Sequence, residues 1–420
     1  MGVILMAEIE TVYNSFEQAC TEGNLSTVEE IVQQLQELTK ENTEANAIYT
    51  KAVAKTIQTF LGKLSTSKVK KLLSDVEAIV EKNLENEELI VNFARALRYS
   101  VDALSTKGQP NAMKEVINNL DNLATKKPDN ESIHEELSNA SYEMVKFWKK
   151  RGDFKALRDR TAKFRELAKK FPDNESIKLN LSKSLVHEIE SSNKRDINKV
   201  DSIISEIQLL SESMPSNVGL QLEWVHAYRT AMVRTQEKPE DAKRWLNSMK
   251  AIALDKKDDA FKLELAHGYL NAITSLNPQN IEELNKHVKE LENLADETKE
   301  NIELQILYAQ SLLISLQMQG ITNFDSTLHT INQLKDLDNE FPKNKAIMQI
   351  YVESLTGIIG MLVQAQKAKE IIPLLEQLEK LDKKYPEDEF IQQTFDQLSS
   401  VLKMVGFKRK KTKKQRLDYL

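Results

Sequence analysis

Residues 172–189 read PDNESIKLNLSKSLVHEI, and residues 256–273 read KKDDAFKLELAHGYLNAI. The two segments align without gaps, and large apolar residues occupy the same places in both, five, nine and seventeen positions after the first residue. Spacings of four and eight residues place side chains on one face of an α-helix. The same pattern recurs every 41 to 44 residues from eight anchors: Leu84, Pro128, Pro172, Pro215, Lys256, Lys299, Pro342 and Pro386. This period predicts tandem helical hairpins that bury their apolar faces against neighbours in line.

Columns counted from the anchors predict the core of the first helix in each hairpin. The plus-five column is apolar throughout: Leu89, Ile133, Ile177, Leu220, Phe261, Leu304, Ile347 and Ile391. The plus-nine and plus-seventeen columns are apolar too: Phe93, Leu137, Leu181, Trp224, Leu265, Tyr308, Tyr351 and Phe395, then Val101, Val145, Ile189, Met232, Ile273, Leu316 and Ile359. The plus-twelve column contains small residues, which let an adjacent helix approach closely: Ala96, Ala140, Ser184, Ala227, Gly268, Ser311 and Ser354.

A second helix precedes each anchor. Apolar residues recur eight and five positions upstream, as at Leu120 and Leu123. Breakers such as Gly108 and Pro110 mark the turns between paired helices. The chain has only 11 Gly and 9 Pro among 420 residues, and 29% of its residues are charged, which favours solvated helices over sheet turns. The composition therefore also predicts an all-α protein.

These residues resemble the tetratricopeptide repeat family. The family spacing of Leu, a small residue and Tyr is matched by LAHGY at 265–269, and the inter-helix turn by RGDF at 151–154. The family period is about 34 residues, so this repeat is elongated, and Leu123 and Arg160 replace small residues of the second helix. The resemblance covers roughly residues 43 to 405 and implies a right-handed all-α solenoid of tandem antiparallel hairpins with about 19 helices. It also implies a protein-binding function.

We expect one continuous solenoid over residues 1–407. Its terminal parts depart from the columns, so the hairpins within 6–82 are interpreted as degenerate repeats and a helix over 387–405 as a cap. The single cysteine, Cys20, favours a reducing compartment and hence the cytoplasm. No stretch approaches the roughly 20 apolar residues that cross a bilayer, so no transmembrane segment is predicted. Self-association into a homo-oligomer is left open.

The C-terminal residues 408–420 reverse the charge of the body. They are expected to be a disordered tail, which either solvates the chain or folds back on the acidic body. Alternatively, the tail contacts nucleic acid, a ribosome or another anionic surface. The residues that would make this contact are Lys408, Arg409, Lys410, Lys411, Lys413, Lys414 and Arg416.

In the tetratricopeptide-like arrangement, the first helices line a concave groove. The columns at plus eight and plus eleven are expected to face it, and they are polar in several repeats. Amide and cationic groups suit recognition of a peptide carboxylate, although a solvated helix face would show the same pattern. The predicted partner-binding residues are Asn92, Arg95, Asn139, Asn180, Lys183, His226 and His267.

Catalytic and cofactor motifs are not evident in the sequence. The six histidines lack a metal-ligand spacing, although His226 and His267 share a column, with Glu223 and Glu264 one turn away. No glycine-rich phosphate loop occurs. We therefore expect a non-enzymatic scaffold or adaptor without a cofactor, which binds a peptide or protein in its groove. The alternative is an RNA- or ribosome-associated protein that uses the basic tail.

Overall fold

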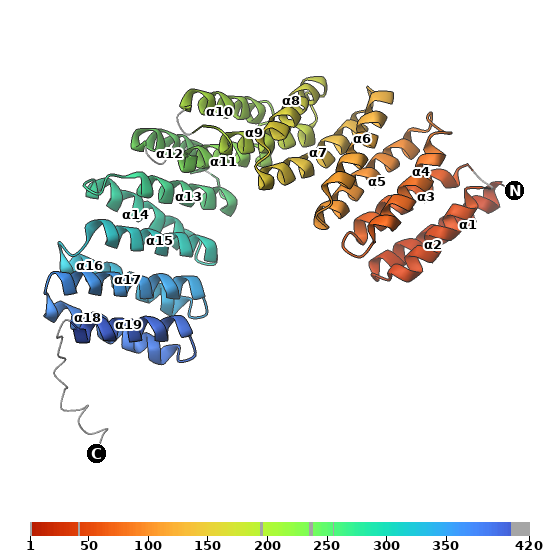
Figure 1. Ribbon diagram of the computed structural model, residues 1–420. Coiled ribbons are helices and arrows are strands. Elements are labelled where there is room, and N and C mark those ends of the chain that lie inside the picture. The colour runs from red at the N-terminus through yellow and green to blue at the C-terminus, as the bar shows by residue number, and fades with distance from the viewer. Residues whose placement is uncertain (1, 41–42, 194–195, 235–237, 255, 405–420) are drawn as a thin grey trace, which may run out of the picture. The chain divides into compact units, whose positions relative to one another are not determined.

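A computed structural model describes residues 2–40, 43–193, 196–234, 238–254 and 256–404 of the chain. Within these ranges it contains nineteen α-helices and no strand (Figure 1), which confirms the predicted fold class of tandem helical hairpins. The helices are α1 (Gly2–Thr21), α2 (Leu25–Leu38), α3 (Ala45–Thr59), α4 (Thr66–Val80), α5 (Glu87–Thr106), α6 (Pro110–Lys126), α7 (Glu131–Arg151), α8 (Phe154–Lys170), α9 (Glu175–Glu190), α10 (Ile197–Glu212), α11 (Val218–Arg234), α12 (Pro239–Ala253), α13 (Asp259–Ser275), α14 (Ile281–Glu297), α15 (Ile302–Gln319), α16 (Phe324–Glu340), α17 (Lys345–Gln364), α18 (Ala368–Lys384) and α19 (Glu389–Met404).

The chain divides into two compact units. Unit 1 comprises Met1–Trp224 and unit 2 comprises Val225–Leu420, so the border lies within α11. The single continuous solenoid expected over 1–407 stays a prediction.

Unit 1 is a row of hairpins. Each odd-numbered first helix pairs with the even-numbered second helix that follows it, and successive first helices α1, α3, α5, α7 and α9 contact one another (Figure 1). The second helices α2, α4, α6 and α8 also contact the next first helix, as α6 does with α7 and α8 with α9. First helices therefore form a continuous layer, which second helices cover from one side.

Unit 2 repeats this plan. The first helices α13, α15 and α17 contact one another in sequence, and α14, α16 and α18 each bridge two of the neighbouring first helices. The last helix, α19, packs against α17 and α18. A capping role for the segment 387–405 agrees with this position and remains a prediction.

The anchor columns form the core. Every residue of the plus-five and plus-seventeen columns is at most 3% exposed, and all seven residues of the plus-twelve column are buried. In the plus-nine column, only Trp224 and Phe395 are partly exposed, while the other members are buried. A Cβ on Gly268 would come within 2.8 Å of Met249 Cε, which confirms the close helix approach predicted for this column. Truncating a buried side chain of this kind to alanine costs about 2–5 kcal/mol.

A further column, two residues after each anchor, explains where the first helices begin. Each of its members is Asn or Asp, and its side chain accepts a hydrogen bond from a backbone N–H in the first turn of the helix. Such a cap satisfies a donor that has no partner within the helix and contributes about 1 kcal/mol. The capping residues are Asn86, Asn130, Asn174, Asn217, Asp258, Asn301, Asn344 and Asp388.

Helix α17 is the one described helix that is long and apolar enough to cross a membrane by length and composition alone. Just over half of its apolar window, 56%, is buried inside the protein. It lies between α15, α16, α18 and α19, and Ile347, Tyr351 and Ile359 belong to the anchor columns. Its apolar composition is therefore explained by its place in the core of unit 2.

Candidate partner-binding surfaces

We define the first-helix face of unit 1 as the side of α5, α7 and α9 that carries Arg95, Asn139 and Lys183. On α5, Asn92 Oδ1 accepts a hydrogen bond from Arg95 Nη1 at 3.4 Å. Arg95 is 48% exposed, and its Nε lies 3.5 Å from Glu136 Oε1 on α7. Asn92 is only 4% exposed, so the prediction that it faces a groove is wrong. Arg95 is accessible at the surface.

Asn139 and Asn180 join α7 to α9. Asn180 Nδ2 donates to Asn139 Oδ1 at 2.7 Å and to Ser138 Oγ at 3.1 Å. The hydroxyl of Ser176 donates to the same Asn139 oxygen at 3.1 Å. Asn180 is 6% exposed, and its predicted groove position is therefore also wrong. The physical reason is that a residue eight positions after the anchor lies in the contact between successive first helices.

Lys183 lies beside an aromatic ring that the sequence analysis did not select. Its Nζ is 5.7 Å from the ring centroid of Tyr142 on α7, and Lys146 Nζ lies at the same distance from that ring. Lys146 is also 2.5 Å from Glu143 Oε1. Within the described part of the chain, Lys183 has no ion-pair partner. The two ammonium groups and the ring thus form a cationic, aromatic patch.

A chain of hydrogen bonds continues from this ring along α9. The Tyr142 hydroxyl lies 3.3 Å from His187 Nε2, and His187 Nδ1 lies 3.2 Å from Glu190 Oε2. Lys149 Nζ on α7 is 2.7 Å from the same carboxylate oxygen. Burial opposes ionisation of Glu190, but the hydrogen bonds and charges of His187 and Lys149 together lower its pKa to about 2. Glu190 therefore stays ionised and holds α7 and α9 together.

Asp102 on α5 shows the opposite shift. Burial raises its pKa to about 6, and Glu143 adds to this effect, while the charge of Arg98 acts against it. Arg98 Nε is 3.5 Å from Asp102 Oδ2, and Asp102 Oδ1 is buried without a hydrogen-bond partner in the described residues. Burial similarly raises the pKa of Glu136. The first-helix face of unit 1 therefore carries charged groups whose burial is only partly compensated by ion pairs and hydrogen bonds.

The two histidines of the predicted set lie in unit 2, on α11 and α13. His267 Nε2 is 3.6 Å from Glu303 Oε1, and burial, with the charge of Arg229, lowers the pKa of His267. Glu264 pairs with Arg229 at 2.8 Å. No group of His, Cys, Asp or Glu side chains suited to a metal ion occurs in the described ranges. His226 is partly buried and contributes to the electrostatics around His267.

Tyr142, Lys146 and Glu190 were missed in the sequence, although a signal for them exists. They lie fourteen or eighteen positions after their anchors, which is three or seven residues beyond the plus-eleven column and therefore on the same helix face. The aromatic residue at this place is confined to one repeat, so no column drew attention to it.

The basic tail was predicted to meet an anionic partner. Its residues lie outside the part of the chain that the structure describes. They are Lys408, Arg409, Lys410, Lys411, Lys413, Lys414 and Arg416.

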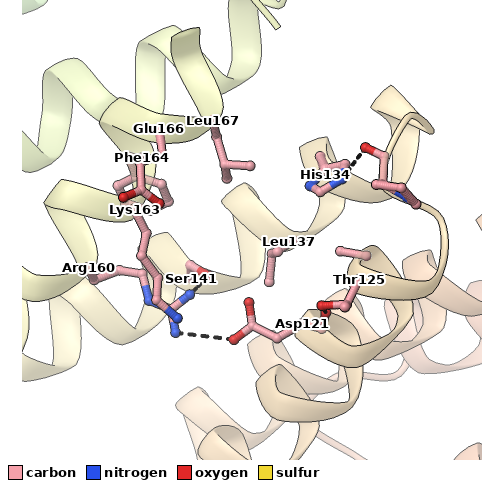
Figure 2. Close-up of a pocket in the computed structure, with 12 residues that line it drawn as sticks. Asp121, Thr125, His134, Leu137, Ser141, Arg160, Lys163, Phe164, Glu166 and Leu167 are labelled. Atoms are coloured by element: carbon pink, nitrogen blue, oxygen red, sulfur yellow. Dashed lines mark hydrogen bonds and ion pairs between the residues drawn. The ribbon is translucent and has the colours of Figure 1, made fainter. Parts of the chain in front are cut away.

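A second surface lies on the other side of the hairpins, where α6 and α8 flank α7. Figure 2 shows Arg160 reaching from α8 towards Asp121 on α6, and His134 turned towards the carbonyl that follows α6. Leu137 of α7 lies between them, below Leu167 of α8. These residues border a cavity of about 340 Å³.

Comparison with known proteins finds matches among solved structures alone. No family model and no curated protein matches it. Among solved structures, the TPR domain of P58(IPK) aligns over 96% of this chain and 100% of its own, at 12% identity and a TM-score of 0.21. A circular tandem repeat protein with novel repeat topology aligns over 96% of this chain and 97% of its own, at 14% identity and a TM-score of 0.20.

The described helices are tetratricopeptide-like hairpins, as the sequence predicted, with a repeat of 41 to 44 residues in place of about 34. Hairpin repeats of this kind generally mediate protein–protein interaction. What this particular chain binds must be inferred from its own surfaces.

Proposed function

We propose that this chain is a non-enzymatic scaffold that binds an acidic peptide segment of a partner protein on the first-helix face of unit 1. Arg95, Lys146 and Lys183 supply the charge, and the ring of Tyr142 supplies apolar area. Arginine and lysine donate charge-assisted hydrogen bonds to carboxylates, and interface energy concentrates on aromatic and arginine anchors.

The observation that carries this proposal is the placement of Lys183 and Tyr142. Lys183 has no carboxylate partner in the described residues and sits over a partly exposed ring. A lysine in this position keeps all three N–H donors available to a partner. Asn139 and Asn180 support the site indirectly, because their hydrogen bonds hold α7 and α9 at a set spacing.

The test begins with purification of the tagged full chain from extract of its source cell, with and without nuclease. Mass spectrometry identifies a partner that survives nuclease, and binding is then measured with purified components. Exchanging both cations, Arg95→Gln and Lys183→Gln, should weaken that complex by about tenfold or more. The weakening should shrink at high salt, because exposed charges are screened.

The matched control exchanges two exposed cations of second helices, Lys126→Gln and Lys169→Gln, which removes the same charge elsewhere. Equal affinity of the two double variants would contradict the proposed site. If all partners disappear with nuclease and with deletion of residues 408–420, the chain instead acts through its basic tail as an RNA- or ribosome-associated protein.

A further inference from the structure

The cavity between α6 and α8 has a floor of apolar side chains. Leu137 of α7 and Phe164 of α8 are 6% and 0% exposed, and Ala124 of α6 and Leu167 of α8 also belong to this floor. Its volume of about 340 Å³ falls at the small end of the range for ligand sites. Both second helices pack on α7, and the ion pair between Arg160 of α8 and Asp121 of α6 spans the space between them.

An arginine replaces an apolar residue at the polar end of this cavity. Twelve positions before the anchors, the neighbouring second helices carry Leu72, Val116 and Ile203, whereas α8 carries Arg160. The Arg160 side chain is only 12% exposed. Its Nη1 donates to Ser141 Oγ at 3.1 Å, and its Nη2 lies 3.6 Å from an Asp121 oxygen. These contacts fix the guanidinium and leave part of its donor capacity unused.

Charge is distributed unevenly around the cavity. Lys163 stands exposed at the rim, next to Arg160 in Figure 2, and has no ion-pair partner in the described residues. The acids are shallower, because Asp121 is 29% exposed and already faces Arg160, and Glu166 is exposed. The most deeply buried charged group in the cavity is therefore the positive guanidinium of Arg160.

The opposite end of the cavity is neutral. His134 is 7% exposed, and its Nε2 donates to the Pro128 carbonyl at 2.8 Å. Its ring lies 4.9 Å from that of Phe171, and burial lowers its pKa. Nδ1 is covered and lacks a hydrogen-bond partner in the described chain. A neutral imidazole next to Leu137 and Leu167 extends the apolar part of the site.

We propose that this cavity binds a small carboxylic acid with an aromatic or branched aliphatic body. The carboxylate lies between Arg160 and Lys163, and the apolar body covers Leu137, Phe164 and Leu167. Arginine binds carboxylates in a fixed geometry, and an apolar pocket with few convergent polar groups is the usual form of a small-molecule site. The same chemistry is presented by a free acid and by the carboxyl-terminal residue of a peptide.

The experiment uses 3-phenylpropionate as the probe and its uncharged amide as the matched comparison. Binding to the full chain is measured by calorimetry and by ligand-observed NMR. The acid should bind at least about tenfold more tightly than the amide, because only the acid forms charge-assisted hydrogen bonds. A tetrapeptide ending in phenylalanine, with free or amidated C-terminus, distinguishes the two sources: tighter binding of the free peptide than of 3-phenylpropionate assigns the site to a protein terminus.

Variants test the position of the ligand. Lys163→Gln should weaken binding of the acid about fivefold to tenfold, whereas Lys169→Gln, an equally exposed change on α8 that is not part of the lining, should leave it unchanged. Thr125→Trp places a large ring at an exposed point of the rim and should abolish binding. Circular dichroism checks that each variant is folded.

Equal affinity of the acid and the amide would overturn the proposal. So would unchanged binding in folded Thr125→Trp protein, or equal weakening by Lys163→Gln and Lys169→Gln. Absence of binding by 3-phenylpropionate and both peptides at about 10 mM, well above the concentration range of specific small-ligand sites, would overturn it as well.

Discussion

The position eight residues after the anchor changes chemistry between three first helices of unit 1 and two of unit 2. On α5, α7 and α9 it is occupied by Asn92, Glu136 and Asn180, whereas on α15 and α17 it is occupied by Leu307 and Ile350. Asn92 and Asn180 are 4% and 6% exposed, and Leu307 and Ile350 are 5% and 8% exposed. The repeat therefore buries an amide at this position on α5 and α9 and an apolar side chain on α15 and α17. On α5 and α9 hydrogen bonds to the amides compensate for the burial, and on α15 and α17 apolar contact stabilises the position directly.

The comparison shows why the polarity of Asn92 and Asn180 led to the wrong prediction that these residues face a groove. A polar residue at a repeat position normally indicates solvent, but burial of a polar group is tolerated once it is hydrogen-bonded. Asn180 satisfies that condition with Asn139 and Ser138. First helices that are joined by such bonds also carry charged neighbours, as Arg95 does on α5 and Lys183 on α9.

The largest expected effect is produced by introducing the polar residue of unit 1 into unit 2. Leu307→Asn on α15 should lower the free energy of unfolding by about 3 kcal/mol, because the amide replaces apolar contacts and finds no prepared partners. Guanidinium unfolding followed by circular dichroism measures the loss. Repeat arrays need not unfold in one step. Hydrogen exchange of peptides from α15 therefore shows whether the loss of stability is located in that helix.

Ile302→Asn is the matched control, because Ile302 lies on the same helix and is 49% exposed. Its effect should stay within about 0.5 kcal/mol. A comparable loss in both variants would show that the plus-eight position has no special place in the contact between first helices.

The next prediction concerns two carboxylates on the first-helix face of unit 1, whose contributions to stability depend on pH in different ways. The pKa of Asp102 is raised to about 6, so its ionisation destabilises the fold as pH rises from about 4 to 6. The pKa of Glu190 is lowered to about 2, so its contribution is present above about pH 4.5 and is lost as pH falls towards 2. Asp102→Asn should therefore stabilise the protein at pH 8, and Glu190→Gln should destabilise it, each by about 1–2 kcal/mol after allowance for solvent screening.

Urea unfolding at pH 8 and pH 4.5 measures both variants. The gain from Asp102→Asn should diminish at pH 4.5, where the native carboxyl is mostly protonated in the fold. The loss from Glu190→Gln should be similar at the two pH values. A gain that persists at pH 4.5 would show that Asp102 acts through packing rather than charge.

Much of the fold could be predicted because periodic burial leaves periodic apolar residues. Ile133, Leu181 and Tyr351 are buried where their columns place them. The cavity at Arg160 could not be predicted, since it depends on the separation of α6 and α8, although the replacement of a small family residue was visible. Tyr142 was missed because a single aromatic residue on a polar face forms no column.

The smallest expected effect is predicted for replacing a buried amide of α9 in unit 1 by an apolar residue of the kind found at the same repeat position on α15 and α17. Asn180→Leu removes the donor to Asn139 and Ser138 and should cost about 1 kcal/mol, since Leu fills similar space but leaves those acceptors with fewer partners. Asn139→Leu alone should cost about as much, because it deprives Asn180 and Ser176 of an acceptor.

The double variant Asn139→Leu, Asn180→Leu removes both ends of the hydrogen bond and brings two apolar side chains together between α7 and α9. It should be more stable than the sum of the single losses by about 1 kcal/mol, which a double-mutant cycle in urea unfolding measures. Strict additivity would mean that the two amides act independently. The coupling would instead show that the first-helix contact accepts either a hydrogen-bonded or an apolar pair, provided that both helices change together.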